Sequence, residues 1–196
     1  MLVGDAGGVD DATNGPALAL LTDAFERIRD GVPDVVEGLS TDELLWRPDP
    51  EANHVAWLVW HLARQQDDQV AGLAGTDPVW TAEGWADRFA LPYPPDAHGW
   101  SMSPADVGAF TVSDPALLSG YQEAVHAPTV DYLGALADLG PEAYDRVVDD
   151  RWDPPVTVGV RLVSVLDDAA KHLGQAEYVR GLIERRRSWP TVPSRP

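Results

Sequence analysis

The chain contains no cysteine, which excludes disulfide bonds, thiolate metal sites and a cysteine nucleophile. It also contains no apolar run close to the ~18 residues that are needed to cross a bilayer. Basic residues are scarce, since 14 lysines and arginines stand against 32 acidic residues, for a formal net charge of −18. A field of this sign repels phosphate backbones, so we expect no nucleic-acid partner. Since no apolar run is long enough to cross a bilayer, we expect no membrane partner either.

The N-terminus lacks the basic start and the apolar middle of a signal peptide, so we expect a cytoplasmic protein. Lysine is almost absent, because Lys171 is the single lysine beside 13 arginines. Together with abundant alanine, glycine, aspartate, proline and valine, this bias is typical of a GC-rich genome.

The length of 196 residues suits one domain with a substantial core, and 44% of the residues are apolar. Residues 1–14 are rich in glycine and aspartate without an apolar period, so we expect a flexible leader there. Residues 188–196 contain three prolines and are expected to form a tail. The predicted domain therefore spans residues 15–187.

Apolar residues recur at intervals of three and four in several long segments, which predicts an all-α protein. The expected helices cover residues 16–39, 54–74, 115–136 and 157–187. Asn53 is placed to cap the second of them. Pro33 and Pro128 predict a kink or a break, because a proline inside a helix costs ~3 kcal/mol.

A long connection, residues 76–114, separates the second and third segments and holds several tryptophans and prolines. Loops of this kind are usually functional or packed against a partner. We expect a short helix near residues 104–110, and no strand pair stands out. A long crossover lets the second and third helices run parallel, which predicts an up-down-down-up four-helix bundle.

Two residues of the fourth segment, Asp168 and His172, are four positions apart and therefore point from the same helix face. That face is apolar, and a carboxylate there is costly unless it is paired. In the second segment, His61 lies where an apolar half gives way to a polar half. If the two helices face each other, two imidazoles and one carboxylate converge, a ligand set that suits zinc, nickel or iron(II). From spacing alone, ordinary core or surface histidines are the alternative.

Two parts of the sequence resemble a known family. The segments LLWRPDPEANH (residues 44–54) and AWLVWHLARQQDD (residues 56–68) resemble the second helix of the DinB-like superfamily. They are most similar to its actinobacterial mycothiol-dependent branch, which includes mycothiol-dependent maleylpyruvate isomerase. The segment HLGQAEYVRG (residues 172–181) resembles the final helix of that family, in which a ligand histidine precedes a Gly-Gln pair.

The resemblance implies that the first ligand histidine of the family falls on His61 and the last on His172. The position four before the last ligand is a histidine in many DinB-like proteins and a glutamate in the isomerase branch, whereas this chain has the shorter Asp168. The resemblance also implies one divalent metal, with zinc as the first choice and nickel or iron as alternatives. Mycothiol would be the thiol co-substrate, and a homodimer is expected through helical faces and the long aromatic loop.

Other polar residues are candidates for supporting roles. His54 lies two turns before His61, and we expect it at the helix start and at the rim of a cofactor pocket. Arg64 either binds a substrate or cofactor carboxylate or pairs with Asp68. Asp67 and Asp68 either accept bonds from ligand imidazoles or form a solvated face.

The remaining histidines and several tryptophans complete the set. His98 lies in the long connection, within possible reach of a pocket, whereas His126 is expected at the surface. The tryptophans are expected in the core or in a pocket wall. They are Trp57, Trp60, Trp85 and Trp152.

Three functional hypotheses follow. The first, implied by the resemblance, is a metal-dependent thiol transferase or isomerase that acts on a small electrophile, with a low-molecular-weight thiol supplied from outside. The second is a non-catalytic, metal-binding dimeric bundle. The third is a hydrolase that uses metal-activated water. A requirement for added thiol would separate the first hypothesis from the other two.

Overall fold

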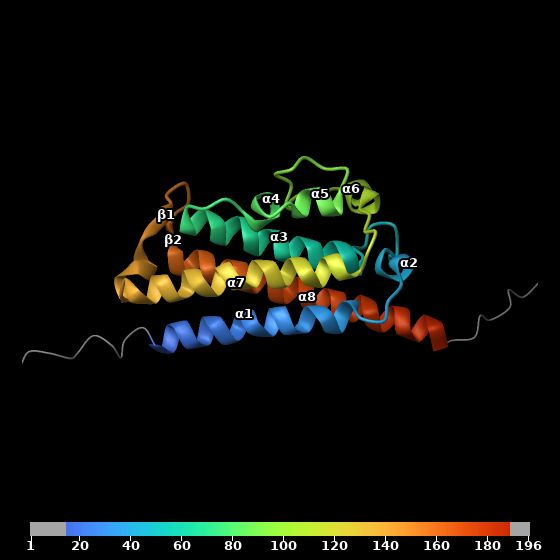
Figure 1. Ribbon diagram of the computed structural model, residues 1–196, viewed down its shortest axis with the longest axis horizontal. Helices are drawn as coiled ribbons and strands as arrows, with labels where there is room; N and C mark the ends of the chain where they lie inside the picture. Colours follow the sequence, from blue (N-terminus) through green and yellow to red (C-terminus); the bar gives the residue numbers. More distant parts are fainter. Residues whose placement is uncertain (1–14, 189–196) are drawn as a thin grey trace, which may run out of the picture.

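The computed structural model describes residues 15–188. Within this range four long helices lie side by side (Figure 1). They are α1 (Gly15–Val36), α3 (Val55–Ala74), α7 (Ala116–Asp138) and α8 (Val158–Ser188). The all-α prediction is confirmed. The expected leader and all but the first residue of the expected tail lie outside the described residues, and Ser188 is the last residue of α8.

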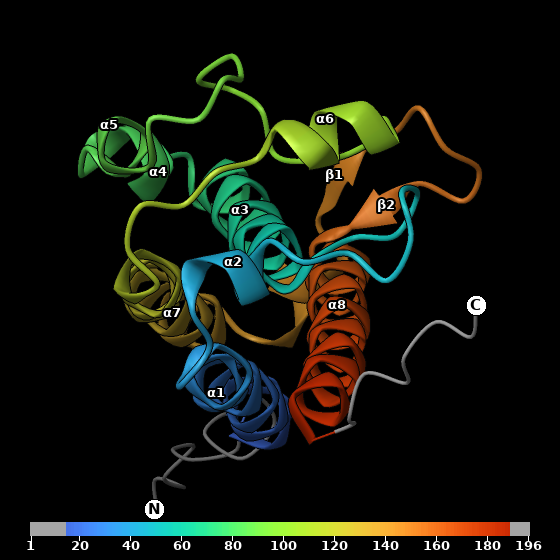
Figure 2. The same cartoon turned by 90° about the vertical axis from the view of Figure 1, so that its right-hand side faces the viewer.

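The four long helices form a ring in the order α1, α7, α3, α8 when the bundle is viewed along its length (Figure 2). Gln69, near the end of α3, accepts a hydrogen bond from Arg161, near the start of α8, so these two helices are antiparallel. Gln66 of α3 donates to Thr129 of α7, and Arg64 donates to Tyr121, so α3 and α7 run in the same direction. Figure 1 shows α1 and α8 running opposite to this pair.

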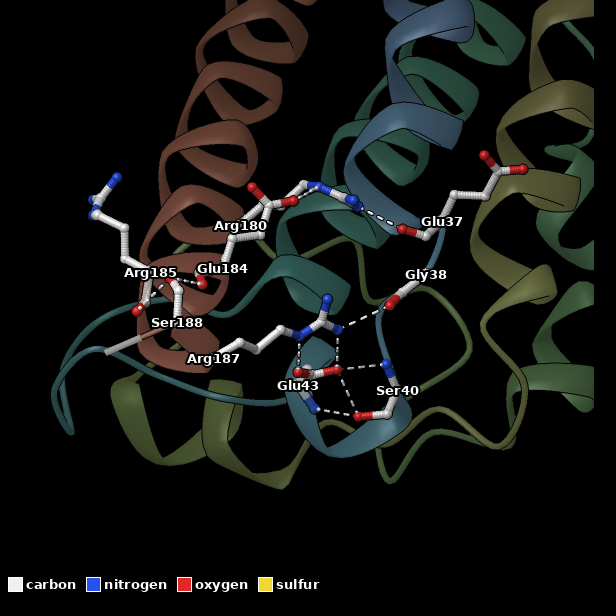
Figure 3. Close-up of polar contacts among 9 residues, drawn as sticks. All are labelled: Glu37, Gly38, Ser40, Glu43, Arg180, Glu184, Arg185, Arg187 and Ser188. Atoms are coloured by element: carbon white, nitrogen blue, oxygen red, sulfur yellow. Dashed lines mark hydrogen bonds and ion pairs between the residues drawn. The ribbon is translucent and has the colours of Figure 1, made fainter. Parts of the chain in front are cut away.

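The ends of α1 and α8 are tied together by polar contacts around α2 (Thr41–Leu44) (Figure 3). Both carboxylate oxygens of Glu43 accept hydrogen bonds of 2.6 Å from the Arg187 guanidinium. Arg187 also donates to the carbonyl of Gly38, at 2.9 Å. Ser40 caps α2, because its hydroxyl accepts from the Glu43 N–H while the Glu43 side chain accepts from the Ser40 N–H. This network holds the chain as it leaves α1.

The cap of α3 differs from the prediction, because His54 and not Asn53 occupies that position. The Nδ1 atom of His54 accepts a hydrogen bond of 3.0 Å from the Trp57 N–H, and its Nε2 atom lies 3.1 Å from the carbonyl oxygen of Val107. The His54 imidazole therefore takes the capping role that was expected of the Asn53 amide. Its second nitrogen is bound by the Val107 carbonyl, in a distant part of the chain.

Pro128 was expected to kink or break the third helix, and the break does not occur, since α7 continues through this residue. The following residue, Thr129, is buried and donates its hydroxyl to the carbonyl of Val125 at 2.8 Å. Buried residues on both sides of the proline, such as Tyr121 and Leu133, fix the two halves of the helix against the core. Packing therefore outweighs the local cost of the proline.

The crossover between α3 and α7 carries three short helices on the outer side of α3 (Figure 1). They are α4 (Val79–Ala82), α5 (Trp85–Phe89) and α6 (Pro104–Ala109). Between α7 and α8, the 3₁₀ turn η1 (Pro141–Asp145) precedes an antiparallel pair, β1 (Val147–Asp149) and β2 (Val156–Thr157). This pair was not predicted, because strands of three and two residues are too short to show an alternating pattern.

Residues of all four long helices form the apolar core. Trp57, Trp60 and Trp85 are buried in it as expected, whereas Trp152 is exposed, which contradicts the expectation for that residue. No helix of the described part of the chain is long and apolar enough to span a membrane.

Candidate metal centre

Three residues from two neighbouring helices come together halfway along the bundle. His61 lies on α3, and Asp168 and His172 lie one turn apart on α8. Each offers one ligand atom, and these atoms all lie within 4.8 Å of one another. The two rings contact each other edge to face, and the Asp168 carboxylate lies close to both, with Oδ2 3.9 Å from Nε2 of His61 and Oδ1 3.5 Å from Nε2 of His172. These separations are compatible with the shared coordination of one ion.

The His61 ring is held in a definite orientation from three sides. Its Nδ1 atom lies 2.6 Å from the carbonyl oxygen of His98, which accepts a hydrogen bond from it. Trp57 stacks on the ring, with centroids 4.7 Å apart and planes 15° apart. Gly99 packs against it with a φ of +95°, a conformation that favours glycine. Because Nδ1 carries the proton, Nε2 faces Asp168 with a free lone pair.

His172 is oriented by its own helix. Its Nδ1 atom lies 3.0 Å from the side-chain oxygen of Gln175, three positions later, and its Nε2 atom faces Asp168. In both imidazoles, the nitrogen that points away from Asp168 is hydrogen-bonded to an oxygen acceptor. Metal-binding histidines in proteins are usually oriented in this way.

Asp168 supplies the test of whether a cation fits. Its Oδ2 atom is buried and has no hydrogen-bond partner among residues 15–188. A buried carboxylate oxygen without a partner is costly, and native proteins rarely leave one. The two imidazole nitrogens that face it are the commonest protein ligands of zinc. The residues present therefore fit a divalent cation.

The electrostatics of His61 and Asp168 agree with a ligand set, whereas at His172 a cation has to compete with a proton. Burial lowers the pKa of His61 to about 4, so this imidazole is neutral at pH 7, as a metal ligand must be. Burial by itself would raise the pKa of Asp168, but the hydrogen bond with His172 and the nearby charges outweigh it and lower that pKa. Burial likewise opposes protonation of His172, but the bonds with Asp168 and Gln175 outweigh it and raise its pKa.

Arg64 and His54 do not lie where a cofactor could reach them. The Arg64 side chain is 1% exposed and bonds inside the protein. Its ionic partner is Asp67, three positions away, and not Asp68. His54 is equally buried and caps α3, so the expected place at a pocket rim is wrong. The reason is the crossover, which covers this side of α3 and supplies Val107 to bond His54.

The structure also places three residues that the sequence left ambiguous or misassigned. Asp67 is buried and accepts bonds from the N–H groups of Val79 and Trp80, so it neither faces solvent nor supports a ligand imidazole directly. His98 reaches the site through its backbone carbonyl, while its ring contacts Gln65. His126, expected at the surface, is 5% exposed.

Comparisons with known proteins agree with this architecture. The family model described as the DinB superfamily matches residues 24–176, a range that includes all three candidate ligands. A crystal structure of a conserved protein from Enterococcus faecalis is similar, with 35% sequence identity and a TM-score of 0.79. The similarity covers 85% of this chain and 96% of that chain. None of the curated proteins matches the sequence.

Proposed function

Because the chain belongs to the DinB superfamily, we propose that it is a metal-dependent enzyme that joins a low-molecular-weight thiol, mycothiol as the first choice, to a small electrophile or isomerises that electrophile. The single observation that carries the proposal is the convergence of His61, Asp168 and His172, with ligand atoms within 4.8 Å and an unpartnered carboxylate oxygen among them. The choice of a thiol follows the resemblance of residues 44–68 and 172–181 to the mycothiol-dependent branch.

The three residues would hold one divalent cation, with zinc as the first choice and nickel or iron(II) as alternatives. When bound, such a cation lowers the pKa of an incoming thiol, so that a thiolate is present at neutral pH. The chain has no cysteine, so the nucleophilic sulfur has to come from outside. Three protein ligands leave at least one coordination position for it.

The surrounding residues keep the ligands ready for this task. The His98 carbonyl and the Gln175 side chain hold the two imidazoles so that neither has to turn when a cation binds. Trp57 covers one face of His61 and excludes water from it. Asp168 contributes the negative charge that a divalent cation requires, and its side chain is 39% exposed against 5% for His61. The site is therefore open to substrate on the α8 side.

A groove beside the site suits the electrophile. It has a volume of about 610 Å³ and includes Gln175, the residue that orients His172. Its walls are mostly apolar, with Leu58, Tyr178 and Leu182 among them. Two charged residues also line the groove. The Lys171 ammonium pairs with Asp167, and Asp49 accepts hydrogen bonds from the N–H groups of Glu51 and Ala52. A small molecule with an apolar body and no strong charge is the chemistry that fits these walls.

A homodimer is part of the proposal. Val160 and Val163 lie at the start of α8 and are 50% and 60% exposed, an apolar surface that a second copy would cover. Multi-angle light scattering of the purified protein tests this point, and a monomer at all concentrations would exclude the dimer.

The test of function combines metal analysis with turnover. The wild-type protein should contain about one zinc, nickel or iron ion per chain, and His172→Ala should contain none. The metal-loaded protein is then mixed with monochlorobimane and with mycothiol, glutathione or cysteine in turn, and the fluorescent conjugate is measured. Thiol-dependent conjugation that His172→Ala lacks supports the proposal. Bound metal without turnover favours the non-catalytic bundle. Turnover of ester substrates without thiol favours the hydrolase. If the protein binds no metal, both enzyme hypotheses are excluded.

A further inference from the structure

We propose that Arg64 is a positioning residue, whose buried guanidinium fixes the segment 97–99 and thereby sets the orientation and the protonated nitrogen of His61. The catalytic meaning of this inference rests on the proposed function. Its physical content is independent, because the orientation of His61 is measurable in protein without metal.

The burial of Arg64 calls for an explanation. The side chain is 1% exposed, although arginine is almost never fully buried unless it is paired. Apolar residues of similar volume often replace a buried ion pair without loss of stability, so stability alone is a weak reason to keep one. The guanidinium must therefore contribute something that an apolar side chain lacks, and its directed N–H groups are the candidate.

One side of the guanidinium is anchored in a rigid network. Its Nη1 atom lies 3.4 Å from Oδ2 of Asp67, and the same carboxylate oxygen accepts a bond of 2.6 Å from the Tyr121 hydroxyl. The backbone N–H groups of Val79 and Trp80 each donate to Asp67 at 2.8 Å. With this many bonds the carboxylate has little freedom to move, so it provides a fixed point for the arginine.

The other side of the guanidinium reaches the crossover. Its Nε atom donates to the carbonyl oxygen of Ala97 at 3.2 Å. The next carbonyl along the chain, that of His98, accepts the bond from Nδ1 of His61. Arg64 and His61 are three positions apart on α3 and so project from one face of that helix. Two side chains from one turn of α3 thus donate hydrogen bonds to two consecutive carbonyl groups of the segment 97–99.

Apart from the contact between the His98 ring and Gln65, the segment has few bonds to hold it at this point. It has no regular secondary structure, and its nearby backbone bonds join Ala97 to Pro94 and Met102 to Gly99. The next residue, Trp100, is 76% exposed. Without the Arg64 bond, the His98 carbonyl loses its fixed position beside His61. The imidazole can then carry its proton on Nε2, the nitrogen that faces Asp168, and that form cannot bind a metal through Nε2.

The test compares variants that affect different parts of this network. Arg64→Lys keeps a positive charge beside Asp67 but loses the directed Nε–H group. Arg64→Met removes the charge as well, and it leaves the buried carboxylate of Asp67 without its cation. If Arg64→Met fails to fold for this reason, Arg64→Lys alone tests the proposal. Tyr121→Phe is the matched control, because it removes the hydroxyl that donates to Asp67 and accepts from Nη1 of Arg64, and it leaves the Nε bond to Ala97 intact. Urea unfolding first establishes the stability of each protein.

The first readout is the long-range ¹⁵N–¹H spectrum of the imidazoles in metal-free protein at neutral pH. We expect a single form of His61 with its proton on Nδ1 in the wild type and in Tyr121→Phe, and a mixture of both forms in Arg64→Lys. The second readout is titration with Co²⁺, followed by its visible spectrum. We expect affinity to fall about 10-fold or more in the Arg64 variants, as is typical when the partner of a ligand histidine is lost, and to stay within about twofold in Tyr121→Phe, which keeps that partner.

The outcomes separate the two proposals. A single Nδ1–H form of His61 and unchanged Co²⁺ binding in folded Arg64→Lys would overturn the positioning role. Equal effects in Tyr121→Phe and Arg64→Lys would also overturn it, because they would reveal a general loss of packing. If the wild-type protein binds no Co²⁺ while the form of His61 still depends on Arg64, the positioning role stands and the metal-dependent function fails.

Discussion

Gly99 packs so closely on the ring of His61 that a Cβ atom at residue 99 would stand 2.2 Å from Nδ1 and 2.9 Å from Cγ. The backbone of Gly99 also has a φ of +95°, which side chains other than that of glycine rarely tolerate. The Nδ1 atom in this contact is the one that donates to the His98 carbonyl. Because residue 99 is glycine, the segment 97–99 can lie directly against the His61 ring, and the His98 carbonyl of this segment orients the ring.

Replacing Gly99 by alanine should therefore damage the candidate metal centre without unfolding the bundle. The added methyl group must displace either the ring or the segment 97–99, and we expect metal affinity to fall about 10-fold or more. Competition with a chromophoric chelator measures this directly. Gly134→Ala is the matched control, because Gly134 lies in α7 with open space around its Cα. It should bind metal normally and gain ~0.5–1 kcal/mol of stability. Full metal affinity in Gly99→Ala would contradict the role assigned to the contact.

Asp168 provides a prediction in which stability and binding change separately. In the metal-free protein the bond with His172 and the nearby charges outweigh burial and lower the pKa of Asp168, so the ionised carboxylate contributes to stability. We expect Asp168→Asn to destabilise the metal-free protein by less than about 1 kcal/mol, because the side chain is 39% exposed. The same variant should lose most of the stabilisation that Zn²⁺ gives, because a neutral amide is a poor partner for a dication. Thermal unfolding with and without Zn²⁺ checks both parts. Destabilisation of the metal-free variant by several degrees would instead assign Asp168 a structural role.

The long helices were predictable because burial imposes a period on the sequence. The buried residues Phe25, Ile28, Val32 and Val35 of α1 are spaced by three and four, and this pattern is visible without any tertiary information. The ends of elements were less predictable. His54 could not be foreseen as the cap of α3, because its second nitrogen is engaged by a carbonyl 53 positions away. The short β1–β2 pair lacked a pattern because its strands are three and two residues long.

The candidate site was predictable where side chains share a helix and unpredictable where the backbone takes part. Asp168 and His172 are neighbours by their spacing of four, and the pairing of α3 with α8 brings His61 to them. The acceptor for His61 is a carbonyl 37 positions further along the chain, and any residue type could supply it. Arg64 was misassigned because Asp67 is three positions later and Asp68 four, and both spacings permit an ion pair within a helix. Only the buried position of Asp67 decides between these two partners.

The link between Glu43 and Arg187 should be visible in acid. The hydrogen bond from Arg187 lowers the pKa of Glu43 to about 2, below its ordinary value of 4.5. A lowered carboxyl pKa contributes stability above pH 4.5, and this contribution is lost as the pH falls towards 2. We expect the Tm of the wild type to fall more steeply over this range than that of Arg187→Gln, and added salt should reduce the difference because the pair is partly exposed. Parallel acid profiles of the two proteins would show that the pair contributes nothing.

His54 should make the protein sensitive to mild acid through the cap of α3. Its Nδ1 atom accepts the Trp57 N–H, so the ring is neutral with its proton on Nε2, where it donates to the Val107 carbonyl. Burial lowers the pKa of His54 to about 4 from an ordinary value of 6.5. The unfolded chain therefore takes up this proton first, so stability is complete above pH 6.5 and falls as the pH drops from 6.5 towards 4, by at most about 1.4 kcal/mol per pH unit for one group.

The variant that isolates this effect is His54→Asn, since asparagine is a good helix cap but does not titrate. At pH 7 it should lose about 1 kcal/mol, the value of the missing bond to Val107. Between pH 6.5 and 4 its stability should fall less steeply than that of the wild type, so that the two curves converge or cross. His61 is also buried and neutral, but it is present in both proteins and its contribution cancels in the difference. Urea unfolding at closely spaced pH values supplies the two curves. A constant gap between them from pH 7 to pH 4 would mean that the pKa of His54 is the same in the folded and unfolded protein. The folded ring would then take up a proton near pH 6.5, and Nδ1 could not accept the Trp57 N–H in mild acid.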